Sequence, residues 1–211
     1  MACDKQWLTT KPQSLVRSAV FLVAMFGAWL VAGSGQAGDQ AAWTSVPEQS
    51  RIAFGSIKSN SIGEVHHFNS VSGTVAQDGT VTITIDLTSA ETNVDIRNER
   101  MAEHVFAGGE ATVSGRVELA AFSDLPVGEV IEVETEMTLS FAGTETDFDA
   151  RLLVARLREN RVMVSTADFI FLSTEDLGID AGIDRLMQLA GLPGITRVSP
   201  MSIRIVFAKS Q

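Results

Sequence analysis

The segment from Ile131 to Phe141 constrains the fold most, because apolar and polar residues alternate along it without a break. One set of alternate positions is mainly apolar and consists of Ile131, Val133, Thr135, Met137, Leu139 and Phe141. The positions between them include three glutamates, Glu132, Glu134 and Glu136. A period of two is that of a β-strand, whereas a helix would mix the two sets. Because three carboxylates cannot be buried without partners, the sequence predicts a strand with one face in the core and the other in water.

The same alternation recurs along the chain and predicts about eight strands. It is clear at residues 81–87, 113–119 and 203–207, and shorter versions occur at 52–57, 68–75, 148–157 and 162–171. Polar turns such as Gln77–Thr80 and Glu159–Arg161 separate these runs. Strands that follow one another through short turns form an antiparallel sandwich or barrel, and a barrel leaves no open edge.

Two segments depart from the β pattern and predict short helices. Residues 93–106 are polar, with Met101 and Val105 at helical spacing. Residues 180–190 carry an apolar stripe that ends before Gly191. The second helix either packs over one end of the barrel or acts as a lid over its mouth, and the sequence leaves both readings open.

The N-terminus has the three-part layout of a secretory signal peptide. Basic residues come first, residues 19–32 form an uncharged apolar stretch, and Gly35-Gln36-Ala37 supplies small residues for cleavage. We predict a signal peptide over residues 1–37 and one exported domain over residues 38–211. The alternative is a retained membrane anchor, since the uncharged run from Ser18 to Gly38 is long enough to span a bilayer.

Charge and cysteine content exclude several classes of partner and chemistry. The one cysteine, Cys3, lies in the predicted signal, so the exported domain has neither a disulfide nor a thiol. Removing residues 1–37 takes away three of the 16 Lys and Arg and one of the 26 Asp and Glu, which moves the net charge from −10 to −12. Such a chain repels phosphate backbones, so we predict no nucleic-acid partner.

No catalytic motif is present, and we predict that the protein is not an enzyme. The sequence lacks a G-x-S-x-G motif. Its histidines are His66, His67 and His104, and the adjacent pair would point to opposite faces of a strand. We interpret the three as solvated loop residues and predict no metal ligands. An enzymatic or haem-binding alternative would rest on these histidines alone.

An apolar interior is the feature that the sequence does supply. The inward positions of the strands, together with two residues placed near one mouth, are our candidate ligand-lining residues. They are Phe54, Ile83, Ile85, Met101, Phe106, Val133, Met137, Leu139, Phe141 and Phe148. An eight-stranded barrel can fill itself with side chains or hold one small ligand, and the sequence leaves both open.

A series of short motifs also follows a fixed order from Trp43 to the C-terminus. The motifs are Trp43-Thr44-Ser45-Val46, Ser50-Arg51-Ile52-Ala53-Phe54, Val71-Ser72-Gly73-Thr74-Val75, Ile85-Asp86-Leu87 with Ser89 and Thr92, Arg97-Asn98 with Met101 and Phe106, Met137 to Gly143, and Asp176-Leu177-Gly178-Ile179. In this order they resemble the YceI-like family of bacterial periplasmic proteins. Departures from the family pattern are Asn98, residues 107–111 and Leu177. Residues 186–195 resemble the branch of the family that is also found fused to cytochrome b561-type membrane domains.

The resemblance implies both a fold and a ligand class. The fold is all-β, an antiparallel lipocalin-like barrel of about eight strands with one or two short helices. The implied protein is periplasmic, in a Gram-negative bacterium, and carries an apolar lipid, a polyisoprenoid or an isoprenoid quinone. It has no agreed catalytic residues and no other cofactor. The alternative is an interaction module with a filled barrel, associated with a membrane redox protein of the cytochrome b561 type. The oligomeric state stays open, a homodimer included.

Overall fold

The computed structural model describes residues 41–107 and 109–210. The predicted signal peptide, its cleavage site after Ala37 and the start of the domain at residue 38 lie outside the described residues. Within the described residues, no helix is long and apolar enough to cross a membrane.

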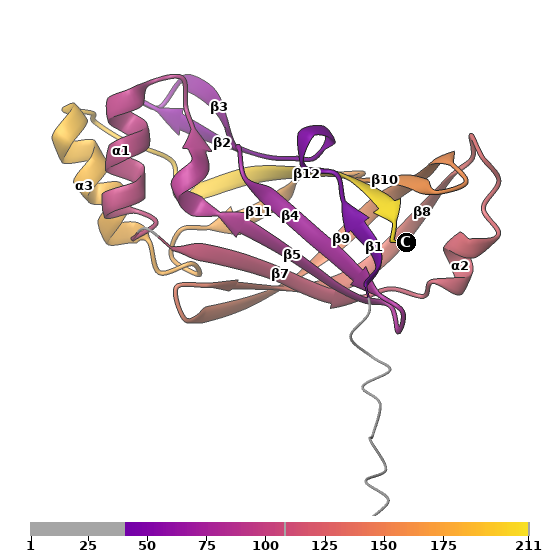
Figure 1. The fold of residues 1–211 in the computed structure, drawn as a ribbon. Helices are drawn as coiled ribbons and strands as arrows, with labels where there is room; N and C mark the ends of the chain where they lie inside the picture. Colours follow the sequence, from indigo (N-terminus) through magenta and orange to yellow (C-terminus); the bar gives the residue numbers. More distant parts are fainter. Residues whose placement is uncertain (1–40, 108, 211) are drawn as a thin grey trace, which may run out of the picture. The chain divides into compact units, whose positions relative to one another are not determined.

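Eight antiparallel strands close into a barrel (Figure 1). In their order around the barrel they are β1 (Ala41–Ser45), β4 (Val71–Ala76), β5 (Thr80–Asp86), β7 (Glu110–Arg116), β8 (Val130–Phe141), β9 (Thr144–Arg158), β10 (Arg161–Thr166) and β12 (Val198–Lys209). Pairing of β12 with β1 completes the circle, from Trp43 opposite Lys209 to Ser45 opposite Phe207. The predicted antiparallel barrel is confirmed.

Four further strands extend the wall of the barrel at one end. They are β2 (Arg51–Lys58), β3 (Ile62–Phe68), β6 (Ala90–Glu91) and β11 (Ile170–Ser173). Each continues the line of a barrel strand after a short break. For example, β2 continues β1, and β12 pairs with both of them: with β1 through Phe207–Lys209 and with β2 through Met201–Arg204. Two short 3-10 turns, η1 (Pro47–Gln49) and η2 (Leu87–Ser89), occupy two of these breaks. The chain therefore runs up and down in eight long paths, several of them bent.

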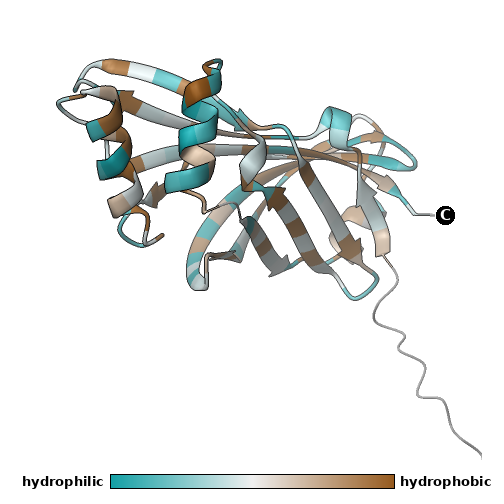
Figure 2. Cartoon of the chain, turned by 60° about the vertical axis from the view of Figure 1, so that its left-hand side comes forward, coloured by the Kyte–Doolittle hydropathy of each residue, from teal (hydrophilic) through white to brown (hydrophobic). Residues whose placement is uncertain are grey.

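Strand β8 has the two faces that its alternation predicts. Met137, Leu139 and Phe141 are buried, whereas the three glutamates are exposed. Arg151 of β9 donates hydrogen bonds to Glu132 across the outer face. Figure 2 shows the same alternation of hydrophobic and hydrophilic residues along the barrel strands.

The helices lie at the two ends of the barrel (Figure 1). Helices α1 (Asp95–His104) and α3 (Asp180–Ala190) pack together at one end, and both were expected from the sequence. At Gly182 a β-carbon would come within 2.3 Å of the carbonyl oxygen of His104, so only glycine permits this close approach of α3 to α1. The single-turn helix α2 (Ala120–Ser123), near the other end, was not predicted.

Several predicted strands are divided or shorter in the structure. The strand expected over residues 162–171 is divided, since β10 ends at Thr166 and β11 begins at Ile170. The strand expected over residues 68–75 is divided, since Phe68 ends β3 and β4 begins at Val71. The strand expected over residues 113–119 ends at Arg116, because Val117 hydrogen-bonds to the turn at Gly79 instead of to a neighbouring strand. Strand β3 itself was not expected over most of its length.

Candidate functional site

Two cavities lie in the barrel. One is at the end where α1 and α3 pack, and the other is near α2. The α3 cavity, of about 200 Å³, is lined by residues of β2, β3, β11, α1 and α3. The α2 cavity, of about 100 Å³, is lined by barrel strands and by Phe122 of α2. The barrel thus has space at two levels.

The candidate lining residues from the sequence all face one cavity or the other. The α3 cavity is lined by Phe54, Ile85, Met101, Phe106, Leu139 and Phe141. The α2 cavity is lined by Ile83, Val133, Met137 and Phe148. The structure therefore divides a set that the sequence treated as one site. A role of these residues in binding stays a prediction.

Aromatic rings gather in the wall of the α3 cavity. Phe54 stacks on Phe68 with ring centroids 5.0 Å apart, and Phe106 lies 5.7 Å from Phe68 and 6.4 Å from Phe141. The ring of His66 lies 5.2 Å from that of Phe54. Four phenylalanines, from β2, β3, β8 and the loop after α1, thus present flat apolar surfaces to one space.

A strip of polar side chains crosses the mainly apolar wall of this cavity, which also contains Arg100, Thr174, Thr196 and Ser199. Glu64 of β3 accepts hydrogen bonds from Lys58 of β2 at 2.9 Å and from Arg97 of α1 at 2.7 Å. Burial raises the pKa of Glu64, but these two hydrogen bonds outweigh it and hold the pKa below its ordinary value. Glu64 is therefore ionised at neutral pH and holds both cations in place.

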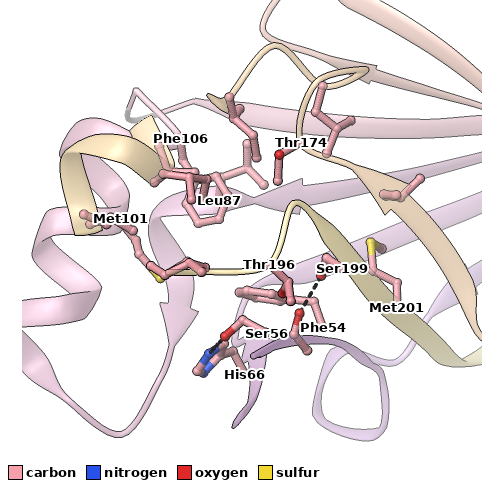
Figure 3. Close-up of a pocket in the computed structure, with 18 of the residues that line it drawn as sticks. Phe54, Ser56, His66, Leu87, Met101, Phe106, Thr174, Thr196, Ser199 and Met201 are labelled. Carbon is pink, nitrogen blue, oxygen red and sulfur yellow. Dashed lines mark hydrogen bonds between the residues drawn. The ribbon is translucent and has the colours of Figure 1, made fainter. Parts of the chain in front are cut away.

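His66 belongs to the same strip, and its interpretation as a solvated loop residue is wrong. It lies on β3, is only 3% exposed and lines the α3 cavity. Its Nε2 atom lies 3.1 Å from the hydroxyl of Ser56 (Figure 3). Burial lowers the pKa of His66, and the positive charge of Arg97 lowers it further. The imidazole is therefore neutral at pH 7.

The other two histidines do not join this site. The prediction of loop residues is wrong for them as well, since His67 lies on β3 and His104 on α1. His67 faces outward, as the alternation of β3 requires, and hydrogen-bonds to Arg51. His104 ends α1 and lies 3.8 Å from Glu103. Among the described residues, no three His, Cys, Asp or Glu side chains come together to hold a metal ion.

Helix α3 covers the α3 cavity with its apolar side. Ile183, Leu186 and Ala190 line the space. The start of the helix is fixed to the barrel wall, because Thr174 donates a hydrogen bond to Asp180 and Arg197 pairs with Asp184. The helix packs over one end of the barrel, as the first of the two predictions states. It also covers a cavity there, which is the position that the second prediction requires. Its movement as a lid stays a prediction.

Several lining residues had no clear signal in the sequence. They are Ser56, Lys58, Glu64, His66, Arg97, Leu172, Thr174 and Ile195. Most are polar or lie outside the alternating runs, so a search for apolar periodicity passes over them. Phe68 and Ile183 belonged to predicted elements but were not placed at a site.

Comparison with known proteins gives matches among solved structures only. A scan against protein-family models and a search of curated proteins give no match. The polyisoprenoid-binding domain from Saccharophagus degradans, implicated in plant cell wall breakdown, is 32% identical with a TM-score of 0.79, and the match covers 81% of this chain and all of that chain.

Two more distant structures also match. BcnA from Burkholderia cenocepacia is 14% identical with a TM-score of 0.59, and the match covers 77% of this chain and 98% of that chain. A mutant of the CJ YceI protein is 12% identical with a TM-score of 0.49, and the match covers 69% of this chain and 84% of that one. At this level of identity, BcnA supports the fold alone.

Proposed function

Because the chain belongs to the YceI-like family, we propose that it binds an isoprenoid lipid inside its barrel and carries it through the periplasm. The relative from Saccharophagus degradans is described as a polyisoprenoid-binding domain, and the present chain spans its full length at 32% identity. Binding, rather than catalysis, is the activity that this likeness supports.

The observation that carries the proposal is the pair of cavities within one closed barrel. The α2 cavity is lined entirely by apolar and aromatic side chains. Burying apolar surface contributes about 25 cal/mol per Å². A hydrocarbon chain therefore gains affinity from such a wall without any polar anchor, and the protein needs no charged contact to retain it.

The alternative of an interaction module with a filled barrel is less well supported. That reading requires side chains to occupy the interior, whereas the described residues leave about 200 and 100 Å³ of space. Association with a cytochrome b561-type membrane protein stays a separate prediction. A pull-down from the membranes of the native host tests it, and failure to recover a membrane protein would count against it.

Mass spectrometry of the protein purified from its native host tests lipid binding. We expect organic solvent to extract an isoprenoid lipid in near-stoichiometric amount. The variant Ala111→Phe places a ring in the α3 cavity, because Ala111 is 2% exposed and lines that space. We expect it to lose most of the lipid. Thr112→Phe places the same ring on the outer face of β7 and serves as the control.

Two results would contradict the proposal. One is wild-type protein that yields no lipid. The other is that Ala111→Phe and Thr112→Phe retain equal amounts of lipid.

Periplasmic export is tested separately by cell fractionation and by N-terminal sequencing, which we expect to give Gly38 as the first residue. A chain that keeps residues 1–37 in the membrane fraction would favour the anchor.

A further inference from the structure

Five exposed hydrophobic side chains share the outer face of the sheet that extends the barrel wall. They are Ile57 of β2, Val65 of β3, Phe169 just before β11, Phe171 of β11 and Val198 of β12. Phe169, Phe171 and Val65 are 65%, 66% and 71% exposed, so most of each side chain is in water. We call these five residues the outer apolar face. Contiguous exposed apolar surface of this kind marks a site of interaction.

The register of the strands makes this face continuous. Phe171 is opposite Pro200 of β12, and Val65 is opposite Gly55 of β2. A β-carbon at Gly55 would lie only 2.9 Å from the ring of Pro200, so these two residues are in direct contact and join the two pairs into one row. An apolar row thus runs across four neighbouring strands, with no polar side chain in it.

The outer apolar face is distinct from the interior of the barrel. None of its five residues lines either cavity, whereas residues that alternate with them along the strands, such as Ser56, His66 and Leu172, line the α3 cavity. Polar residues therefore point inward on β2 and β3 while apolar residues point outward, the reverse of the pattern on β8. Packing of the core does not account for the outward set.

Two arginines lie on the same side of the sheet, next to the apolar residues. Arg51 of β2 and Arg204 of β12 are directly opposite each other, and both are exposed. Neither forms an ion pair with any residue that the structure describes. Like charges directly opposite each other destabilise an antiparallel pair. An anion that binds both arginines from outside is therefore favoured.

The acidic residues beside this face are already engaged. Asp168, which precedes Phe169, pairs with Arg151 at 2.9 Å. Glu91, on β6 beside β3, accepts a hydrogen bond from Asn98 at 3.2 Å. The whole chain has a net charge of −10, so an anionic surface is repelled by most of the molecule. The pair of free arginines makes this face the exception and gives an approaching anionic surface one preferred orientation.

These charges favour a membrane surface over a second copy of the chain. A second copy would bring the same two arginines, and the carboxylates beside its own face are engaged as well. A bilayer with anionic phospholipid offers phosphate oxygens, which arginine binds through paired N–H groups. Directly beneath them it offers hydrocarbon, which receives apolar side chains. One surface therefore satisfies both the arginines and the apolar residues.

We propose that the outer apolar face docks on a bilayer that contains anionic phospholipid. Phe169 and Phe171 insert among the acyl chains, and Arg51 and Arg204 bind the phosphates of the head groups. This goes beyond the proposed function, because the docking needs no lipid inside the barrel.

Sedimentation with sucrose-loaded vesicles tests the docking, with protein purified from its native host. One set of vesicles contains phosphatidylcholine alone, and the other contains phosphatidylcholine and phosphatidylglycerol in equal parts. We expect the wild-type protein to partition about tenfold more strongly onto the second set, since each arginine near an anionic surface contributes about fivefold. Added salt should reduce this difference, because it screens exposed charges.

A double variant, Phe169→Ser with Phe171→Ser, removes the two exposed rings. We expect its partitioning onto both sets of vesicles to fall about tenfold or more, because the apolar surface that enters the bilayer is lost. Val127→Ser with Val130→Ser is the matched control, since it removes two other exposed hydrophobic side chains, which follow α2 in the chain. We expect this control to partition like the wild type.

A second double variant, Arg51→Gln with Arg204→Gln, separates charge from apolar insertion. We expect it to keep binding to phosphatidylcholine and to lose the preference for phosphatidylglycerol. Arg158→Gln with Arg161→Gln is its control, because these arginines are also opposite each other but lie at the turn between β9 and β10. All four double variants should keep the barrel lipid, since none of the changed residues lines a cavity.

The outcomes separate this inference from the proposed function. Wild-type protein that carries a lipid but sediments with neither set of vesicles overturns the docking and leaves lipid binding intact. Wild-type protein that sediments with vesicles but carries no lipid does the opposite. Equal losses in a double variant and its control also overturn the docking. Light scattering tests the second copy: a wild-type dimer that becomes a monomer in Phe169→Ser with Phe171→Ser would mean that another copy covers this face, and the membrane proposal would be wrong.

Discussion

The two cavities share one barrel but differ in what lines them. The wall of the α2 cavity is made of apolar and aromatic side chains throughout. The α3 cavity adds a polar strip of five residues, Ser56, Lys58, Glu64, His66 and Arg97, and a cover formed by α3. Four further polar residues, Arg100, Thr174, Thr196 and Ser199, also line it. The first offers affinity that depends on area alone. The second also offers directional hydrogen bonds, so it can determine which end of an amphiphile it holds.

The boundary between the cavities is marked by Ile52, the most buried large side chain of the barrel wall. It is 0% exposed and lines neither cavity. In the sheet it pairs with Phe68, which lines the α3 cavity, and with Ile203, which lines the α2 cavity. We infer that Ile52 belongs to a layer that separates the two spaces.

Removing this layer is the largest change that we predict. Ile52→Ala should lower the free energy of unfolding by about 2–5 kcal/mol, the usual cost of truncating a buried isoleucine. We expect the truncation also to join the two spaces, so that a ligand with a long tail binds relatively better. Chemical denaturation measures the first effect, and titration with hexadecylbenzene and decylbenzene measures the second.

Ile57→Ala on the same strand is the control, since Ile57 is 43% exposed. We expect its cost to be a small fraction of that at Ile52. Equal costs at the two positions would mean that Ile52 is no more than an ordinary wall residue. An unchanged preference for tail length would mean that the layer does not separate the spaces.

The sequence predicted the two cavities unequally, and the reason is chemical. The strands around the α2 cavity bury apolar residues at every second position, as Ile83 and Met137 do, so alternation reveals them directly. Strand β3 was missed because two of its inward positions are Glu64 and His66. Polar inward residues break the apolar pattern, and such breaks are expected where a protein binds something.

The contacts of the polar strip could not be derived from sequence spacing. Arg97 lies 33 residues from Glu64 and on a different kind of element, so the ion pair depends on how α1 folds back over β3. The motif that contains Arg97 and Asn98 pointed to a family but not to this role. In the structure, Asn98 accepts hydrogen bonds from the backbone and side chain of Thr92, which fixes the start of α1.

The next prediction narrows the α2 cavity alone. Ala150 is buried and lines this space, so Ala150→Leu adds three carbon atoms to a volume of about 100 Å³. A tail displaced by one or two methylene groups should lose about 1–2 kcal/mol of binding free energy. Calorimetry should show this loss for hexadecylbenzene and little change for decylbenzene.

Ala155→Leu provides the matched control for this change. Ala155 lies on the same strand, one position out of phase with the inward residues, and lines neither cavity. We expect it to leave both affinities unchanged. An equal loss in the two variants, or a loss for decylbenzene only, would show that the tail does not lie in the α2 cavity.

The smallest effect concerns the proton of His66 and belongs to the α3 cavity alone. Burial and the nearby charge of Arg97 lower the pKa of His66 in the folded protein. Because the unfolded chain then takes up the proton first, the stability that neutral His66 contributes is present above about pH 6.5 and is lost as the pH falls toward the folded pKa. The slope is at most about 1.4 kcal/mol per pH unit.

Glu64, Lys58 and His67 also act on His66, so the pH window has to be chosen with care. The pKa of Glu64 is lowered as well, and its contribution is lost only at more acid pH, below the ordinary range of a glutamate. Denaturation between pH 7 and about pH 5 therefore isolates His66.

Over this range the wild-type protein should lose stability relative to His66→Phe, whereas His67→Phe should follow the wild type. Parallel curves for the wild type and His66→Phe would show that the imidazole is not held neutral by the α3 cavity. The polar strip would then be closer to water than its burial indicates, and the contrast between the two cavities would be reduced to one of size.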